Sequence, residues 1–253
     1  MTRNLPIDIL WDILEYVDKA GLATICRVSK ICCFYSQDVL YRDIGVKTPS
    51  AHRVLAQSTH LASKVRSFDT NFESDLAVIL RNMTSLRILK LPSGICADIL
   101  DGCTFKLDSF ECVYVYDPSG SFQRFLNSQP SLKSVTFPMN FGSTVSVDAT
   151  CLPNLTRFKA TYPWLPYLIP GRPLNEVILD GFCSYENPTD LSFFALSTTP
   201  IQKLTIDYSF LYSTPAHLLA SFLPSLTHFT LTVKNRFISS DSDYEGVCGL
   251  PLY

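Results

Sequence analysis

The side chains in this sequence with the widest chemical range are its cysteines, which could form disulfides or bind a metal. Their number is odd and their spacing is irregular, whereas a small secreted protein held together by disulfides shows an even, patterned set. We therefore expect free thiols and an intracellular protein, in the cytoplasm, the nucleus or both. The nine are Cys26, Cys32, Cys33, Cys96, Cys103, Cys112, Cys151, Cys183 and Cys248.

A zinc site would need cysteines and histidines at chelating spacings. Cys32 and Cys33 are adjacent rather than separated by two residues, and the histidines lie far from paired cysteines. We expect no metal and no cofactor. Cys112 and Cys183 fall in or just after apolar blocks, where a buried thiol acts as a small hydrophobic side chain. The four histidines are His52, His60, His217 and His228.

Catalytic motifs are also missing from the sequence. It contains no Gly-x-Ser-x-Gly, no phosphate-binding glycine loop, no His-Glu-x-x-His and no dinucleotide fingerprint. We interpret the chain as a non-enzyme, and a hydrolase with an unrecognised site remains the third alternative.

The charge balance argues against two classes of partner. With 21 basic and 23 acidic residues the net charge is −2, so no strong field attracts nucleic acid or an anionic membrane. The segment 208–233 lacks charged side chains, but Pro215, Pro224 and two histidines suit a repeat unit better than a membrane span. Asp8, Asp12 and Glu15 interrupt the apolar N-terminal stretch, which excludes a secretory signal.

The N-terminal residues 5–17 have the pattern of a helix with an unusually wide apolar surface. Asp8, Asp12 and Glu15 form one narrow polar stripe, and apolar side chains cover most of the remaining circumference. Pro6 stands near the first turn, where its missing N–H does no harm. Such a helix requires burial on more than one side.

Two more short helices should follow. Asp18 ends the first element or caps the second, which contains Leu22, Ile25, Cys26 and Val28, and the third extends from Phe34 to Ile44. Three helices in roughly 45 residues are near the lower size limit for independent folding and carry more apolar side chains than they can cover. A partner protein would supply the missing contacts, although these helices could instead only cap a repeat stack.

This segment resembles the F-box motif in the order and spacing of its residues. The resemblance rests on Leu5-Pro6-Ile7-Asp8-Ile9-Leu10, Ile13-Leu14, Leu22 and Arg27-Val28-Ser29-Lys30, with Leu40-Tyr41-Arg42-Asp43-Ile44 as the ending. It implies binding to the Skp-type adaptor of a cullin ubiquitin ligase. The residues that would face that adaptor are Leu5, Pro6, Ile9, Leu10, Ile13, Leu14, Leu22 and Val28. Where many family members carry a tryptophan, this chain has Ile31, Cys32 and Cys33, which removes a large contact group.

From residue 48 onward a block recurs with apolar residues at its first, fourth and sixth positions. Its period varies from 19 to 27 residues, and its alternation suits a strand with one buried face. The blocks begin at Val65, Leu86, Leu107, Leu132, Leu155, Leu174, Ile201 and Leu226. They resemble irregular leucine-rich repeats without a regular asparagine. This predicts an α/β chain with a three-helix F-box domain (1–47) and a solenoid of about eight units (48–253) whose parallel sheet forms the concave face.

Helices should return the chain between these strands on the convex side. We predict them at 75–83, 95–100, 122–127, 190–196 and 216–223, and only loops at 151–182. After the last strand no capping helix is evident, so we expect the tail to fold back over 226–233 or the chain to self-associate. A shortened relative of longer proteins is one interpretation of this end.

The strand positions between buried residues must point to the concave face. They form two rows that mix both charge signs with hydroxyls, which suits a protein target. The charged and histidine positions expected to bind it are Asp69, Lys90, Glu111, Lys159, Arg157, Glu176, Lys203 and His228. The predicted function is that of a substrate adaptor in a cullin ligase, with a non-catalytic repeat scaffold as the alternative and the target's identity left open.

Overall fold

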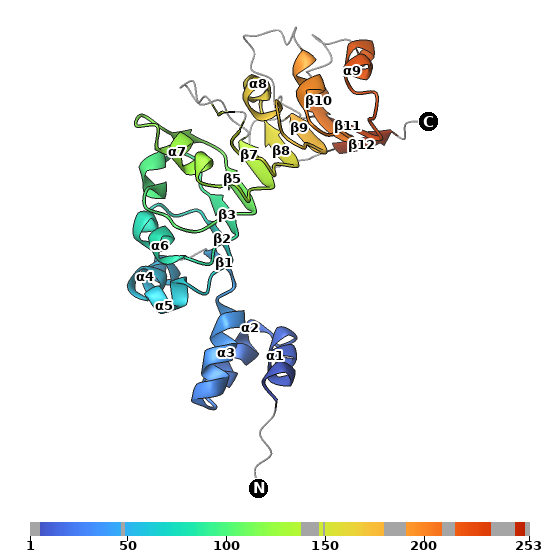
Figure 1. The fold of residues 1–253 in the computed structure, drawn as a ribbon. Helices are drawn as coiled ribbons and strands as arrows, with labels where there is room; N and C mark the ends of the chain where they lie inside the picture. Colours follow the sequence, from blue (N-terminus) through green and yellow to red (C-terminus); the bar gives the residue numbers. More distant parts are fainter. Residues whose placement is uncertain are drawn as a thin grey trace. The chain divides into compact units, whose positions relative to one another are not determined.

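The computed structural model of the chain describes residues 6–46, 49–137, 147–148, 150–179, 191–208, 216–233 and 246–250. The chain has an α/β fold (Figure 1) and packs into two compact units. The first comprises Met1–Lys90 with Ile99–Phe105, and the second comprises Leu91–Asp98 with Lys106–Tyr253. This division follows packing alone, so the predicted boundary between 47 and 48 remains a prediction.

The first unit begins with three short helices, α1 (Ile7–Glu15), α2 (Lys19–Ile25) and α3 (Lys30–Leu40). Asp18 caps α2, as expected, because its carboxylate accepts a hydrogen bond from the Gly21 N–H at 2.8 Å. A Cβ at Gly21 would lie 2.5 Å from the Val17 side chain, so the tight turn between α1 and α2 requires glycine here. The Ser29 hydroxyl caps α3 in the same way through the Cys32 N–H.

The third helix is shorter than predicted. It ends at Leu40, and Ile44 lies in strand β1 (Asp43–Val46), so the expectation of a helix through Ile44 is wrong. The physical reason is pairing, because β1 runs parallel to β2 (Ser67–Thr70) and the Arg42 carbonyl accepts from the Arg66 and Ser67 N–H groups. This ladder outweighs the helical preference of a single apolar position.

The rest of the first unit alternates strands with helices. Helices α4 (Pro49–Gln57) and α5 (Thr59–Ala62) were not predicted, whereas α6 (Leu76–Asn82) confirms the helix expected at 75–83. Strand β3 (Ile88–Leu91) pairs in parallel with β2, and α4, α5 and α6 lie to one side of these strands (Figure 1).

The interior of the first unit contains buried apolar side chains from its strands, Phe68 and Leu89, and from α4 and α6, such as Leu55 and Leu80. Buried His52 of α4 contacts the Thr70 hydroxyl at 2.6 Å and the Ser74 carbonyl at 3.1 Å, and its ring packs near Phe68 and Phe72. This histidine is a satisfied core residue.

The second unit contains a parallel sheet in the order β5, β7, β8, β9, β10, β11. Each of these strands, like β2 and β3, begins two residues after the start of its predicted block, so all eight predicted strands are confirmed. Strand β12 (Gly246–Leu250) pairs antiparallel with β11, which confirms the expectation that the tail folds back over 226–233. The parallel strands are β5 (Ser109–Cys112), β7 (Ser134–Phe137), β8 (Arg157–Ala160), β9 (Glu176–Leu179), β10 (Lys203–Asp207) and β11 (His228–Val233).

The segments between these strands contain two of the predicted helices, whereas two other predictions are wrong. Helices α7 (Ser121–Asn127) and α9 (Ala216–Phe222) occur as expected, but 190–196 contains the 3₁₀ turn η3 (Ser192–Leu196). Segment 95–100, part of which belongs to the first unit, forms strand β4 (Ile95–Cys96) and the 3₁₀ turn η1 (Ala97–Leu100). Strand β4 pairs in parallel with β6 (Val115–Tyr116).

The prediction that 151–182 holds only loops between its strands is wrong. A 3₁₀ turn, η2 (Tyr162–Trp164), leads into the short helix α8 (Leu165–Leu168). Pro163 and Pro166 stand at the first positions of these turns, where proline favours a helical start. Trp164, Leu165 and Leu168 are buried, so packing stabilises a segment with weak helical propensity.

Aromatic rings fill the core of the second unit. Phe110, Phe122, Phe125, Phe137 and Trp164 form a contiguous group whose paired ring centroids are 5.2–6.0 Å apart. Strand residues that alternate with these and other apolar side chains point to the opposite, open face of the sheet.

Arg172 is fully buried in the second unit and has no carboxylate partner in the contacts it makes. Its guanidinium donates to four backbone carbonyls at 2.7–3.1 Å. Burial lowers its pKa. Because these carbonyls belong to two stretches of the chain, 148–151 and 167–170, the side chain holds the two stretches together. The acceptors are the carbonyls of Asp148, Cys151, Tyr167 and Pro170.

Candidate binding surfaces

Helix α1 and the residues just after it carry two neighbouring apolar stripes that differ in burial. Leu10, Leu14 and Val17 form the inner stripe, in which Leu14 is completely buried and the other two are half-buried. The outer stripe consists of Ile9, Ile13 and Tyr16, which are 44%, 47% and 91% exposed. The two stripes together form the wide apolar surface that the sequence indicated. The outer stripe remains exposed in the described part of the unit.

The start of α3 and the turn before it add a second group of exposed apolar side chains. Val28, Ile31 and Phe34 are 71%, 61% and 50% exposed. Ile31 and Phe34 are three residues apart on the helix and therefore share a face. We call Ile9, Ile13, Tyr16, Val28, Ile31 and Phe34 the exposed apolar set.

The residues predicted to face the adaptor separate into an exposed and a buried class. Pro6, Ile9, Ile13 and Val28 are exposed and Leu10 is half-buried. Leu14 and Leu22 are buried, so they hold the helices together and are absent from the surface. Leu5 lies outside the described residues.

The sequence prediction missed Tyr16, Ile31 and Phe34 as surface residues, together with exposed Ile7. Helical periodicity could have found Tyr16, because it stands at positions i+7 and i+3 from Ile9 and Ile13. No sequence signal separates an exposed Phe34 from a buried one. Its ring packs against Tyr35 and lies 4.4 Å from the Lys64 ammonium nitrogen, which also pairs with Asp38.

Ion pairs fix the three helices to one another and to the strand that follows. Arg42 donates two hydrogen bonds to the Glu15 carboxylate, at 2.5 and 2.7 Å. These hydrogen bonds lower the pKa of Glu15 and raise that of Arg42. Trp11 of α1 also packs edge-on against Tyr35 of α3, with ring centroids 5.9 Å apart. The exposed apolar set is therefore held on a braced framework.

The open face of the first unit's sheet carries Asp69 and Lys90, which are register partners on β2 and β3. Both are exposed, as predicted for the concave face. Ser67 and Ile88 form the neighbouring pair. Because the Asp69 carboxylate and the Lys90 ammonium group have opposite charges, this pair adds no net charge to the face.

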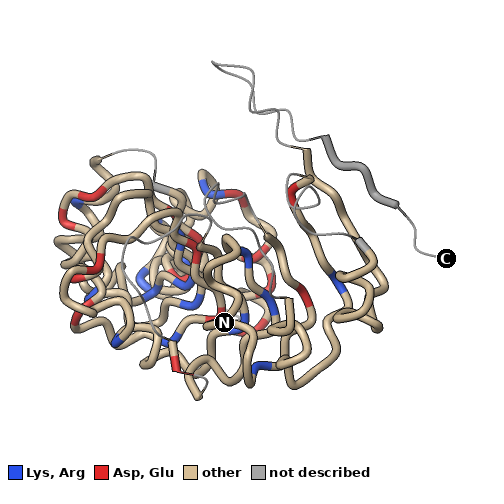
Figure 2. The backbone as a smooth tube through the Cα atoms, turned by 90° about the horizontal axis from the view of Figure 1, so that it is seen from above, with Lys and Arg blue, Asp and Glu red and all other residues tan. Residues whose placement is uncertain are grey.

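The open face of the second unit brings the other predicted residues into register. One row consists of Ser109, Ser134, Arg157, Glu176, Lys203 and His228, and the other consists of Glu111, Thr136, Lys159, Ile178, Thr205 and Thr230. All twelve positions are exposed or half-buried. Arg157 pairs with Glu176 at 3.4 Å. Figure 2 shows that both charge signs are interspersed along the chain, without a long run of one sign.

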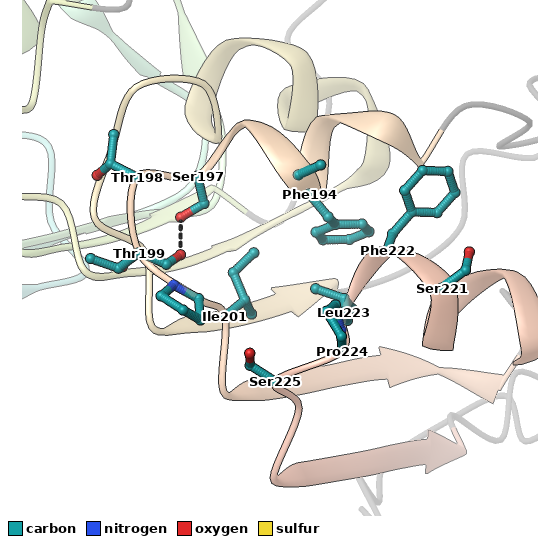
Figure 3. Close-up of a pocket in the computed structure, with 12 residues that line it drawn as sticks. Phe194, Ser197, Thr198, Thr199, Ile201, Ser221, Phe222, Leu223, Pro224 and Ser225 are labelled. Atoms are coloured by element: carbon teal, nitrogen blue, oxygen red, sulfur yellow. Dashed lines mark hydrogen bonds between the residues drawn. The ribbon is translucent and has the colours of Figure 1, made fainter.

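A hollow of about 430 Å³ lies between η3 and α9 in the second unit (Figure 3). Its lining includes Phe194, Ile201, Phe222 and Leu223, with hydroxyls such as that of Ser197, which donates to the Thr199 carbonyl. None of the lining side chains in the described part of the chain is ionisable, so these residues supply no general acid, general base or charged metal ligand.

The first unit also has a hollow of about 300 Å³. It is lined by Tyr41, Ile44, Ser50, Ala51, Val54 and Leu55. Among the described lining residues, Tyr41 alone carries an ionisable group, and most of the others are apolar.

A cluster of polar side chains lies at the start of α7. The Asp98 carboxylate accepts from the hydroxyls of Ser119 and Ser121, which lowers the pKa of Asp98. Arg124 donates to the Ser121 hydroxyl. Because its pKa is lowered, the Asp98 carboxylate is a weak base, so this cluster is poorly suited to activate a serine as a nucleophile.

Thiols in the described part of the chain are free. Cys112 is buried, as predicted for a core position, and donates weakly to the Pro92 and Tyr114 carbonyls. Burial raises its pKa to about 12. Cys183 lies outside the described residues. The described residues include no group of three or more His, Cys, Asp or Glu side chains placed to hold a metal ion.

Comparisons with known proteins give no relative: no family model matches the chain, and no curated protein has a similar sequence. None of the helices in the described ranges is both long enough and apolar enough to cross a membrane.

Proposed function

We propose that the chain is a substrate-binding adaptor of an SCF-type cullin ubiquitin ligase. In this proposal residues 1–47 form an F-box that binds a Skp-type adaptor. Residues 48–253 form an irregular leucine-rich repeat array that binds a target protein. The chain would perform no bond chemistry, because holding a target near a charged conjugating enzyme is enough to raise the rate of transfer.

The observation that carries the proposal is the exposed apolar set. Three short helices already have an interior, built around Leu14 and Leu22, yet they also expose Ile7 and the six residues of the exposed apolar set. A cluster of this kind on a small surface marks a site for protein contacts. The proposed repeat array is supported separately by the parallel strands, which occur at the positions of the recurring sequence blocks.

One observation favours the alternative, a non-catalytic scaffold whose N-terminal helices only cap the sheet. The chain passes from α3 into β1, and Lys64 contacts both Asp38 and Phe34 of α3. The helices are thus attached to the first strands as a cap would be. A cap, however, has no need for exposed apolar side chains on α1.

Co-expression with a Skp-type adaptor separates the two functions. The test variant is Ile9→Asp with Ile13→Asp, and the matched control is Val54→Asp with Val78→Asp on α4 and α6. The control side chains have the same exposed fractions, 44% and 47%, and belong to the same unit. Leu14 is unsuitable because a charge there would enter the interior.

We expect the native chain and the control to co-purify with the adaptor and the test variant to lose it by about tenfold or more, since buried apolar contacts dominate such interfaces. Circular dichroism should show that both variants remain folded. If neither the native chain nor the control retains the adaptor, the scaffold function is correct and the ligase proposal is wrong.

A further inference from the structure

Two thiols of the first unit meet where α2 passes into α3. Cys26 ends α2, and Cys33 stands in the first turn of α3. The Cys26 sulfur lies 4.0 Å from the Cys33 carbonyl oxygen. Burial raises the pKa of Cys26, and the charge of the Cys33 thiol and a hydrogen bond between the two thiols raise it further. The two sulfur atoms are therefore neighbours.

The backbone around the pair keeps the two thiols facing each other. Helices α2 and α3 pack together (Figure 1), and only the turn that ends at Ser29 separates them. The Cys33 N–H donates to the Ser29 carbonyl at 2.8 Å, which fixes the first turn of α3. Both cysteines are half-buried, so a small reagent can reach them. A disulfide needs its two Cβ atoms about 3.5 to 4.5 Å apart, which neighbouring thiols can reach with a small movement.

We propose that Cys26 and Cys33 form a reversible modification site, at which a low-molecular-weight disulfide such as oxidised glutathione generates an intramolecular disulfide. We call these two residues the α2–α3 thiol pair. Disulfides in reducing compartments are usually transient, and they act in catalysis or in sensing the redox state. A pair that is free in the reduced chain and close enough to join suits the second of these roles.

The reaction takes two exchange steps. In the first, one thiol of the pair loses its proton, and its sulfur attacks oxidised glutathione. The glutathione S–S bond breaks, one reduced glutathione leaves, and a mixed disulfide remains on the chain. In the second, the other thiol loses its proton and attacks the protein sulfur of this mixed disulfide, which releases a second reduced glutathione. The chain loses two electrons and two protons, and one oxidised glutathione becomes two reduced molecules.

Cys32 provides a matched control beside the pair. It is also half-buried and stands next to Cys33 on α3. Successive residues of a helix point about 100° apart, so Cys32 faces a different direction from Cys33. The contacts of the Cys26 sulfur are with Cys33. We therefore expect Cys32 to take no part in the link.

The ring closed by the link would contain two residues of the exposed apolar set, Val28 and Ile31. An S–S bond is about 2.05 Å long, much shorter than a hydrogen-bonded contact between two thiols. Closure must therefore draw the start of α3 toward the end of α2. This shifts Val28 and Ile31 relative to Ile9 and Ile13 on α1. The effect on a partner rests on the proposed function: the oxidised chain should bind the Skp-type adaptor more weakly than the reduced chain.

Peptide mapping without reduction tests the link. The full chain is incubated with glutathione of increasing oxidised share, free thiols are blocked with N-ethylmaleimide, and the chain is digested with trypsin. Arg27 and Lys30 lie between the two cysteines, so a link would join peptide 20–27 to peptide 31–42. The proteins are the native chain, Cys26→Ser, Cys33→Ser and the control Cys32→Ser. Circular dichroism checks that each variant is folded.

We expect the joined peptides from the native chain and from Cys32→Ser, and their disappearance after treatment with dithiothreitol. Cys26→Ser and Cys33→Ser should give about tenfold less of the joined peptides or none. A link that persists in Cys33→Ser or is lost in Cys32→Ser would overturn the assignment. So would the absence of a link in the native chain at the highest oxidised share.

The adaptor co-purification experiment separates this inference from the proposed function. Oxidation should lower the adaptor retained by the native chain by about threefold or more and leave Cys33→Ser unchanged, because interface contacts depend on close fit. A mapped link with unchanged retention would refute the effect on binding alone. A mapped link in a chain whose reduced form retains no adaptor would refute the ligase proposal and leave the modification site standing.

Discussion

The two compact units differ in where they leave apolar side chains. In the second unit most apolar strand residues are buried and the open face shows charges and hydroxyls, with Ile178 and the apolar residues of β11 as exceptions. In the first unit helix α1 exposes Ile9 and Ile13 beside a buried Leu14. Large apolar contacts suit a stable partner, whereas mixed polar contacts suit selective recognition. The difference indicates two kinds of binding within one chain.

The largest effect should come from Arg172, which tests how the second unit is held together. Arg172→Met should lower the free energy of unfolding by about 4 kcal/mol, because it leaves four buried carbonyls without a donor. Chemical denaturation measures this change. Arg172→Lys is the control, and it should recover only part of the loss because an ammonium group lacks the planar fork. Full recovery by lysine would contradict the assigned role.

A matched pair on α1 sharpens the contrast between inner and outer stripes. Leu14→Ala should cost about 3 kcal/mol of unfolding free energy, because it opens a cavity in the interior. Ile13→Ala, one residue earlier, should cost less than about 1 kcal/mol, because its side chain is already half in water. Denaturation curves for both variants provide the measurement, and similar costs would show that the stripes are not distinct.

Lowering the pH should weaken the ion pair between Arg42 and Glu15, which holds α1 to the end of α3. The hydrogen bonds from Arg42 lower the pKa of Glu15, so this carboxylate contributes stability above its unfolded-state pKa and loses it as the pH falls through the folded value. Tryptophan fluorescence of Trp11, with Trp164→Phe as background, should therefore show a transition on acidification. Glu15→Gln should shift that transition or remove it.

Buried thiols provide a smaller, chemical contrast. Burial raises the pKa of Cys112 and of Cys103 to about 12, so both should resist alkylation at pH 8.5 in the folded chain and react in denaturant. The same shift makes the stability contribution of these neutral thiols complete below the unfolded pKa and progressively lost as the pH rises toward 12. Mass spectrometry of alkylated peptides measures the protection.

The smallest effect concerns the exposed ion pair on the open face. A double-mutant cycle on Arg157 and Glu176 should give a coupling below about 1 kcal/mol that fades with added salt, because Arg157 is largely exposed. The same pair should matter more for target selectivity than for stability. A coupling that is insensitive to salt would mean that the pair is better shielded than its exposure suggests.

The strands were predictable from sequence because alternation of buried residues has a strict period of two. The blocks therefore located the parallel strands of the large sheet from β2 to β11, but not the short pair β4 and β6, and the register placed the predicted rows side by side. Strand β1 was missed because Ile44 was assigned to the end of the third helix, whereas pairing with β2 makes Asp43–Val46 a strand. Helix α8 was missed because tertiary burial, and not local propensity, stabilises it.

The surfaces were predictable in position but not in detail. Spacing indicated that residues 5–28 form an apolar docking face, yet it could not separate the buried Leu14 and Leu22 from exposed Ile13 and Val28. That separation depends on which side of α1 packs against its neighbours. Likewise, the rows named Arg157, Lys159 and Lys203 but not the apolar position among them, because the prediction selected charged residues.

Strand β1 follows α3 after only two residues, which limits where recombination could exchange the N-terminal helices. An exchange of the N-terminal helices with those of another protein at residue 47 would also carry away β1 and the Arg42 carbonyl that binds the start of β2. Strand β2 would lose its pairing partner β1. Lys64 would lose the Asp38 carboxylate and the Phe34 ring that it contacts. The helices are thus exchanged together with a strand, so the incoming segment would have to supply a new strand that can pair with β2.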